Sequence, residues 1–238
     1  MKAMIFAAGL GTRLKPYTDT KPKALVEVNG KPLLEHAIEH LASFGFNEIV
    51  INTHHFGNQI IDFIHNYKNT SVELFISDES EELLDTGGGL VFAKHFFEKD
   101  ENFVLYNVDI ISDLNLKSLM LNHIQTGALA TLAIRERKSS RYFVFDENLR
   151  LKGWKNSQTG QEIGAFDLSR DKMLAFSGIH AVNASIFDYI HQDGKFSITP
   201  IYLDLAKDYK IMGHLDNSGY WLDCGKPEHI EKAASFLT

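Results

Sequence analysis

Residues suited to phosphate chemistry gather near the start of the chain, where a glycine-containing loop follows a short apolar run. Residues 7–14 read Ala-Ala-Gly-Leu-Gly-Thr-Arg-Leu, and Lys21 and Lys23 follow closely. Gly9 and Gly11 let successive backbone N–H groups converge on an anion, because no Cβ blocks the approach. Arginine offers a planar fork for phosphate oxygens, and lysine adds a mobile positive charge. The stretch therefore predicts a phosphate-binding loop in preference to a tight turn with solvated charges.

Two widespread phosphate motifs do not fit this loop. A dinucleotide-binding fingerprint needs a third glycine that opens a helix, but Leu14 stands there and Pro16 follows. A P-loop needs Gly-Lys-Ser or Gly-Lys-Thr at its end, which the sequence lacks. What remains is a loop of backbone amides that carries its own arginine, Arg13, with Lys23 shortly after it.

A strongly apolar segment ends in polar residues that favour a site. Residues 103–107 predict a strand that stops before Asp109. Ligands of open α/β sheets bind at the carboxyl ends of strands, so we expect Asp109 to be functional and Asn107 to contact the substrate. Helix capping does not explain Asp109, because Ser112 and Asp113 are better placed to cap the helical segment that follows.

The elements that must position these residues alternate between strands and helices over the first half of the chain. Apolar runs predict strands at residues 2–8, 48–52, 72–76 and 103–107, and helical spacing predicts helices at 32–44 and 58–67. Residues 9–23 and 77–89 are expected to be irregular. This order predicts an α/β fold, a Rossmann-like open and mainly parallel sheet with helices on both faces.

The second half of the chain predicts a different order of elements. Strand-like pieces joined by short loops predict a small antiparallel lobe, which makes the sheet mixed. These pieces cover residues 128–134, 142–145 and 149–154. The remaining elements are expected as a strand at 175–182, helices at 184–190 and 200–209, a strand at 219–222 and a helix from 227. One continuous domain over residues 1–238 fits better than two, since no Pro/Ser-rich linker interrupts the chain.

Composition excludes several classes of function. Of the 238 residues, 44% are hydrophobic and 23% are charged, which is typical of a globular protein. A net charge of −7 argues against a non-specific nucleic-acid binder, which needs a broad basic face. No apolar run has the length of a membrane span or a signal peptide, so no membrane partner is expected. A single cysteine, Cys224, excludes an intramolecular disulfide and favours a reducing, cytoplasmic location.

Two other candidates for chemistry are interpreted as structural. His36 and His40 have helical spacing, but Ala37 stands where the zinc-protease motif requires glutamate. The pair is therefore expected on a solvated helix face. Cys224 is expected to pack and not to react.

Four short motifs closely resemble the signature of the sugar-1-phosphate nucleotidylyltransferases. They are Gly-Leu-Gly-Thr-Arg-Leu at 9–14, Pro-Lys-Ala-Leu at 22–25, Gly-Lys-Pro-Leu at 30–33 and Trp-Leu-Asp-Cys-Gly at 221–225. The resemblance spans essentially the whole chain. It implies the nucleotide-diphospho-sugar transferase fold, with a nucleotide-binding half at 1–112 and a sugar-phosphate-binding half at 113–238. The resemblance is greatest to the short form, which includes N-acetylmuramate-1-phosphate uridylyltransferases and mannose-1-phosphate guanylyltransferases.

The resemblance also implies which residues bind the nucleotide. Gly11 and Arg13 would hold the triphosphate, and Lys23 would reach its α-phosphate. Residues 85–89, Asp-Thr-Gly-Gly-Gly, are similar to the base-binding loop of the short form. The implied nucleotide-binding set is Ala7, Ala8, Gly9, Gly11, Thr12, Arg13, Lys23, Asp85, Gly87 and Gly88. The implied catalytic set is Arg13, Lys23 and Asp109.

The metal and sugar ligands follow from the same resemblance. Asp223 alone would be interpreted as a turn residue, but the family pattern pairs it with Asp109 around one Mg²⁺. Magnesium prefers one or two carboxylates together with substrate phosphates. Gly178 aligns with a glycine that the family places against the hexose, with a strand bulge as the open alternative. Lys155 corresponds to the basic residue that relatives use on the sugar phosphate, although Trp-Lys-Asn replaces the usual Glu-Lys-Pro.

In the implied reaction, an oxygen of a sugar 1-phosphate attacks the α-phosphorus of a nucleoside triphosphate, and pyrophosphate leaves. The nucleophile is already an anion, so the protein must supply positioning and charge stabilisation and no general base. The expected pair is UTP with N-acetylmuramate 1-phosphate, which would give a cell-wall or glycan precursor. The alternatives are GTP with mannose or heptose 1-phosphate, choline-phosphate cytidylyl transfer, and a non-catalytic relative that binds a nucleotide-sugar. The sequence does not indicate an oligomeric state.

Overall fold

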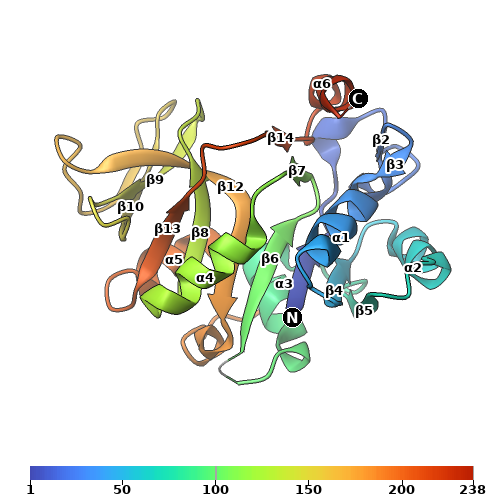
Figure 1. Cartoon of the computed structure of the whole chain (residues 1–238), viewed down its shortest axis with the longest axis horizontal. Helices are drawn as coiled ribbons and strands as arrows, with labels where there is room; N and C mark the ends of the chain where they lie inside the picture. The colour runs from blue at the N-terminus through green and yellow to red at the C-terminus, as the bar shows by residue number, and fades with distance from the viewer. Residues whose placement is uncertain (100, 238) are drawn as a thin grey trace.

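The computed structural model describes residues 1–99 and 101–237, and over these residues ten strands form one mixed sheet. Four neighbouring strands of this sheet are parallel, because β1 pairs with β4 and β6, and β4 pairs with β5. The parallel strands, in spatial order, are β6 (Asn102–Asn107), β1 (Lys2–Phe6), β4 (Glu48–Thr53) and β5 (Glu73–Asp78). All four point the same way, so their carboxyl ends meet at one edge of the sheet (Figure 1).

Helices cover both faces of this sheet, as alternation along β1 shows. Ala3 and Ile5 pack into one core, and Met4 and Phe6 pack into the other. The first core is closed by α1 (Leu33–Ser43), α2 (Gly57–Asn66) and α4 (Leu116–Thr126). The second is closed by α3 (Asp85–Phe92), the 3₁₀ helices η3 (Ala93–Phe96) and η4 (Ala184–Asp188), and α5 (Ile198–Leu205). This arrangement confirms the predicted Rossmann-like sheet with helices on both faces.

The rest of the sheet is mostly antiparallel and forms the predicted lobe. The long strand β12 (Lys172–Asn183) runs antiparallel to β6 and also pairs with the neighbouring strands of the lobe. The lobe strands are β8 (Ala130–Arg135), β9 (Arg141–Phe145), β10 (Leu151–Asn156), β11 (Glu162–Gly164) and β13 (Ile211–Leu215). Figure 1 shows β9 and β10 at the left, away from the parallel strands.

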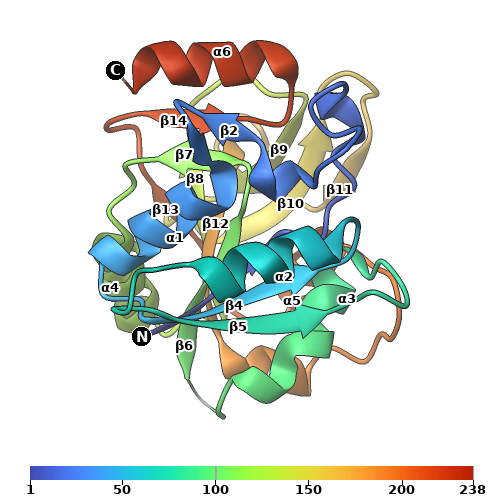
Figure 2. The same cartoon turned by 90° about the vertical axis from the view of Figure 1, so that its right-hand side faces the viewer.

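Small elements lie above the carboxyl edge of the parallel strands. Two short sheets pair β2 (Glu27–Val28) with β3 (Lys31–Pro32), and β7 (Ile110–Ser112) with β14 (Trp221–Asp223). The glycine loop contains η1 (Thr12–Leu14) and η2 (Lys23–Leu25), and α6 (Pro227–Phe236) closes the chain. In Figures 1 and 2, α6 lies across the top of the molecule, next to β2 and β14.

Several expected elements differ from the structure. Residues 85–92 form α3 where an irregular stretch was expected, because tertiary packing stabilises a helix that three consecutive glycines disfavour. The strand β13 was not predicted, and the helix expected at 184–190 is the shorter 3₁₀ helix η4. Asn115, and neither Ser112 nor Asp113, caps α4 by accepting from Ser118 N at 2.9 Å.

The predicted solvated face for His36 and His40 is wrong. The His40 ring lies 3.0 Å from Tyr106 Oη and 3.0 Å from Leu114 O, and burial lowers its pKa. His36 Nε2 lies 3.1 Å from Val28 O. Both rings therefore join α1 to neighbouring segments. Among the described residues, no helix combines the length and the apolar character that crossing a membrane requires.

Candidate active site

The pairing of β7 with β14 brings together two aspartates that are far apart in the sequence. Asp223 is the register partner of Ile110, the residue that follows Asp109. The N–H of Cys224 donates to Asp109 O at 2.8 Å, which fixes the two segments beside each other. Burial raises the pKa of the Cys224 thiol to about 12, so this cysteine packs under the site in its neutral form.

Gly225 marks the point around which three charged groups meet. A Cβ at this position would lie 2.7 Å from Asp223 Oδ1, 3.2 Å from Arg13 Nη2 and 3.3 Å from Asp109 Oδ2. The Gly225 N–H also donates to Asp223 Oδ1 at 2.8 Å, which orients that carboxylate. A glycine is therefore needed here for space, since any side chain would push into the charged cluster.

Lys23 completes this cluster. It begins η2, and its Nζ forms an ion pair with Asp109 Oδ2 in which both side chains are largely buried. Gly11 lets the loop approach this lysine, because its φ is +65° and a Cβ would lie 3.1 Å from Lys23 Cβ. Thr18 Oγ1 donates to Gly11 O at 2.9 Å and holds the loop in place. The structure thus gathers Arg13, Lys23, Asp109 and Asp223 in one place.

The donor set at this point fits a magnesium ion. Two carboxylates converge there, and in the described part of the chain no group of three His, Cys, Asp or Glu residues could hold a metal. Mg²⁺ is commonly bound by one or two carboxylates, with substrate phosphates and water as its other ligands. Asp109 and Asp223 would be its protein ligands, and Lys23 would have to give up part of its contact with Asp109.

The amides of the glycine loop fall into two groups. Ala7 N and Ala8 N both donate to Asn52 Oδ1, at 2.6 and 3.2 Å. Across the described residues, the N–H groups of residues 9–13 meet no acceptor from the protein. An anion can therefore be held by the amides of Gly9, Gly11, Thr12 and Arg13, whereas Ala7 and Ala8 position the loop through Asn52.

Asn52 and Glu79 link this loop to the expected base-binding segment, and the sequence reasoning missed both. Asn52 Nδ2 donates to Glu79 Oε1 at 2.7 Å, and Leu84 N donates to Glu79 Oε2 at 3.3 Å. Glu79 is 2% exposed, and burial raises its pKa. A Cβ at Gly89 would lie 2.5 Å from Glu79 Oε1, so this glycine admits the carboxylate. The sequence feature that could have indicated both residues is their position as polar residues at the ends of the neighbouring strands β4 and β5.

The glycines of α3 have a packing role. The N–H groups of Gly87 and Gly88 donate to Phe196 O at 2.8 and 3.2 Å, so both amides are engaged within the protein. A Cβ on either glycine would collide with residues 194–196. Asp85 has a φ of +60°, and its Oδ1 accepts from Thr86 N at 2.6 Å. The base contacts expected of Asp85, Gly87 and Gly88 stay predictions.

Two of the predicted sugar-side residues, Asn107 and Gly178, lie beside each other near the segment that carries Asp109. Gly178 sits in the irregular part of β12 between Phe176 and His180, with a φ of +77°. A Cβ there would lie 3.0 Å from Asn107 Nδ2 and 2.8 Å from Ile110 Cγ1. The strand bulge that was the open alternative for Gly178 is thus present, and it allows β12 to approach the segment that carries Asp109. A contact of Gly178 with the sugar stays a prediction. Lys155 instead forms an ion pair with Glu162 at 2.6 Å across β10 and β11.

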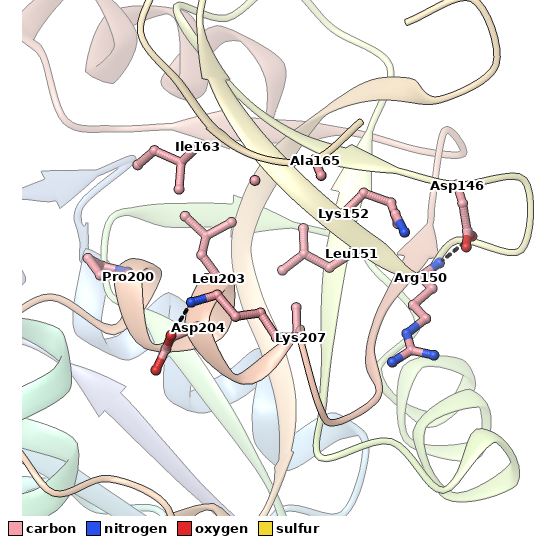
Figure 3. Close-up of a pocket in the computed structure, with 12 residues that line it drawn as sticks. Asp146, Arg150, Leu151, Lys152, Ile163, Ala165, Pro200, Leu203, Asp204 and Lys207 are labelled. Atoms are coloured by element: carbon pink, nitrogen blue, oxygen red, sulfur yellow. Dashed lines mark hydrogen bonds and ion pairs between the residues drawn. The ribbon is translucent and has the colours of Figure 1, made fainter. Parts of the chain in front are cut away.

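A separate pocket lies away from these residues, between β10, β11 and α5 (Figure 3). None of the predicted site residues lines it. One of its lysines is paired, with Lys207 Nζ 2.6 Å from Asp204 Oδ1. The pocket includes neither the glycine loop nor the two aspartates that the β7–β14 pairing brings together, so the charged cluster at Gly225 is the better candidate for the active site.

Comparison with known proteins identifies the class of enzyme. The pattern of the nucleotidyl transferase family matches residues 2–238, and the chain belongs to this family. The N-acetylmuramate alpha-1-phosphate uridylyltransferase of Caulobacter vibrioides is 29% identical over 238 residues, which cover 95% of this chain and 92% of the relative. The mannose-1-phosphate guanyltransferase of Candida albicans is 31% identical over 96% of this chain and 62% of the relative.

Solved structures share the fold. HddC from Yersinia pseudotuberculosis complexed with GMP-PN superposes with a TM-score of 0.80 at 23% identity, covering 100% of this chain and 99% of that one. A UDP-glucose pyrophosphorylase from Acinetobacter superposes with a TM-score of 0.83 at 16% identity, covering 99% and 92%. These comparisons confirm the predicted family, fold class and enzyme class, a sugar-1-phosphate nucleotidyltransferase.

Proposed function

We propose that this chain joins a nucleoside triphosphate to a sugar 1-phosphate and releases pyrophosphate, with Mg²⁺ held by Asp109 and Asp223. The observation that supports this most is the meeting of Arg13, Lys23, Asp109 and Asp223 around Gly225. Three of these residues come from the expected nucleotide-binding half, 1–112, and Asp223 comes from the expected sugar-phosphate-binding half, 113–238. We therefore propose that the site forms between the two expected halves of a single domain. We also place the enzyme in the cytoplasm.

Each residue of the proposed site has a different role in the reaction. The attacking sugar phosphate oxygen is already an anion, so the barrier lies in bringing two anions together and stabilising charge on the α-phosphoryl and leaving groups. Arg13 and the amides of residues 9–13 suit the departing pyrophosphate, and Lys23 suits the α-phosphate. Bound Mg²⁺ would neutralise phosphate charge and help to align the reacting groups.

We propose UTP and N-acetylmuramate 1-phosphate as the substrates, which would make the product a cell-wall or glycan precursor. The support is the Caulobacter relative, which matches along 92% of its length. GTP with mannose 1-phosphate is the second candidate, supported by the Candida relative at 31% identity. That relative extends well beyond the matched region, so its activity is the weaker guide.

A panel of triphosphates and sugar 1-phosphates tests this function. Pyrophosphate release is followed for each pair with Mg²⁺ and again after chelation, and chelation is expected to abolish turnover. Highest kcat/KM with UTP and N-acetylmuramate 1-phosphate would support the first pair. Binding of a nucleotide-sugar without turnover on any pair would contradict the proposal and favour a non-catalytic relative.

A further inference from the structure

Arg137 lies just beyond β8 and is held rigidly beside the candidate site. Its guanidinium lies 3.9 Å above the centroid of the Trp221 ring. Its Nη2 donates to Phe176 O at 2.8 Å. Stacking on the indole ring and a hydrogen bond to the backbone fix the plane of the guanidinium. The side chain is therefore already ordered and loses less conformational entropy when a ligand binds.

This guanidinium keeps unused donors and an unpaired charge. Its Nε is buried and donates to no acceptor in the described part of the chain, and none of the ion pairs found there includes Arg137. The neighbouring Arg135 provides the contrast, because it forms an ion pair with Asp216 Oδ2 at 3.0 Å and also donates to Asp216 O at 2.8 Å. Burial lowers the pKa of this guanidinium, and the nearby Asp223 carboxylate opposes that shift without forming an ion pair with it. A half-buried cation that lacks an ion-pair partner in the described part of the chain is suited to an anionic ligand.

The position of Arg137 relates it to the second substrate. Trp221 stands two residues before Asp223 on β14, so both side chains lie on the same side of that strand. Trp221 Nε1 donates to Ser177 O at 2.8 Å, next to Gly178. Arg137 is thus placed where β14 meets the irregular part of β12, close to Asp223.

We infer that Arg137 binds the phosphate of the sugar 1-phosphate and holds it for attack on the α-phosphorus. This inference rests on the proposed function. Nη1 and Nη2 each donate to one backbone carbonyl, Lys138 O and Phe176 O, and each keeps a second N–H for a phosphate oxygen. Lys155, the residue that the family pattern suggests, is engaged by Glu162. Arg137 is the binding residue, and Trp221 positions it.

A fluorescence titration tests the anion site without relying on turnover. The chain has two tryptophans, so Trp154→Phe leaves Trp221 as the reporter that lies against Arg137. Titration with inorganic phosphate is expected to change Trp221 emission saturably. The change should disappear in Arg137→Gln and persist in Arg141→Gln, which removes an exposed arginine of the same lobe. No saturable change with Arg137 present, or an unaltered response in Arg137→Gln, overturns the inference.

Kinetics then tests the role in the reaction. Arg137→Gln is expected to raise the KM for the sugar 1-phosphate on the order of 10- to 100-fold, the effect of losing one hydrogen bond to a charged group. The KM for the triphosphate should stay within about twofold, and Arg137→Lys should recover part of the loss. An unchanged KM for the sugar 1-phosphate in an active Arg137→Gln enzyme overturns the inference and leaves the proposed function standing. If no pair turns over with the wild type, the proposed function fails and the phosphate titration still decides whether Arg137 binds an anion.

Discussion

Replacing Gly225 by alanine adds one methyl group at the centre of the charged cluster. The φ of Gly225 lies outside the left-handed region, so alanine can adopt its backbone conformation. The new Cβ would nevertheless lie 2.7 Å from Asp223 Oδ1, whereas an ordinary contact needs about 3.5 Å. The Asp223 carboxylate must therefore move by roughly 0.5–1 Å, and its hydrogen bond from the 225 N–H is weakened.

A displacement of this size should lower activity strongly while the fold remains intact. A misplacement of about 1 Å in a positioning group commonly costs about 100-fold in rate, and we expect kcat/KM for Gly225→Ala to fall by about that factor. Pyrophosphate release at saturating Mg²⁺ measures it, and a thermal melt checks the fold. The half-maximal Mg²⁺ concentration should rise as well, because Asp223 is a proposed ligand.

Gly57→Ala is the matched control. A Cβ at Gly57 would lie 3.5 Å from Thr53 Oγ1, which is an ordinary contact, and residue 57 begins α2 away from the cluster. We expect this variant to keep wild-type kcat/KM. Turnover of Gly225→Ala within a few-fold of the wild type, with an unchanged Mg²⁺ requirement, would refute the assignment of this point as the catalytic centre.

Three further changes test other parts of the structure. Lys23→Ala and Asp109→Asn should each lower kcat by about 10²–10³, as measured by pyrophosphate release, because each removes charge stabilisation at the reacting phosphates; near-wild-type turnover in either would contradict its proposed role. Asn52→Leu should lower the free energy of unfolding by about 1–3 kcal/mol for each N–H of Ala7 and Ala8 left without an acceptor, as measured by denaturant titration, and an unchanged midpoint would show that the loop does not depend on Asn52. Since burial raises the pKa of Cys224 to about 12, the thiol stays protonated at pH 8 in the fold, so alkylation should be slow in native protein and fast in denaturant; equal rates would show that the cysteine is accessible.

The sequence was a good guide where local pattern and sheet geometry agree. Asp109 was expected to be functional because it follows a buried strand, and the structure places it at the carboxyl edge beside Lys23. Its meeting with Asp223 followed only from the family resemblance, because the β7–β14 pairing joins distant segments that no local pattern connects. Asn52 and Glu79 were missed for the same reason, since their contact depends on two strand ends being neighbours in space.

Local patterns failed where tertiary contacts outweigh intrinsic preference. Three consecutive glycines disfavour a helix, yet α3 forms because the loop at 194–196 packs on Gly87 and Gly88. Charged and polar helix positions are usually solvated, yet His40 is held between Tyr106 and Leu114. Lys155 matches a basic position of the family motif. The motif does not include Glu162, the cross-strand neighbour that forms an ion pair with Lys155 in the structure.

The short β7–β14 pairing has a consequence for biosynthesis. Its two strands are residues 110–112 and 221–223, so the residues that pair are far apart in the sequence. Domains emerge from the ribosome N-terminal first, and the parallel strands can associate before residue 223 has been synthesised. A partly made chain could then hold phosphates at residues 9–13 and yet lack the second carboxylate. Catalytic competence would thus appear only after β14 has been synthesised and has joined β7.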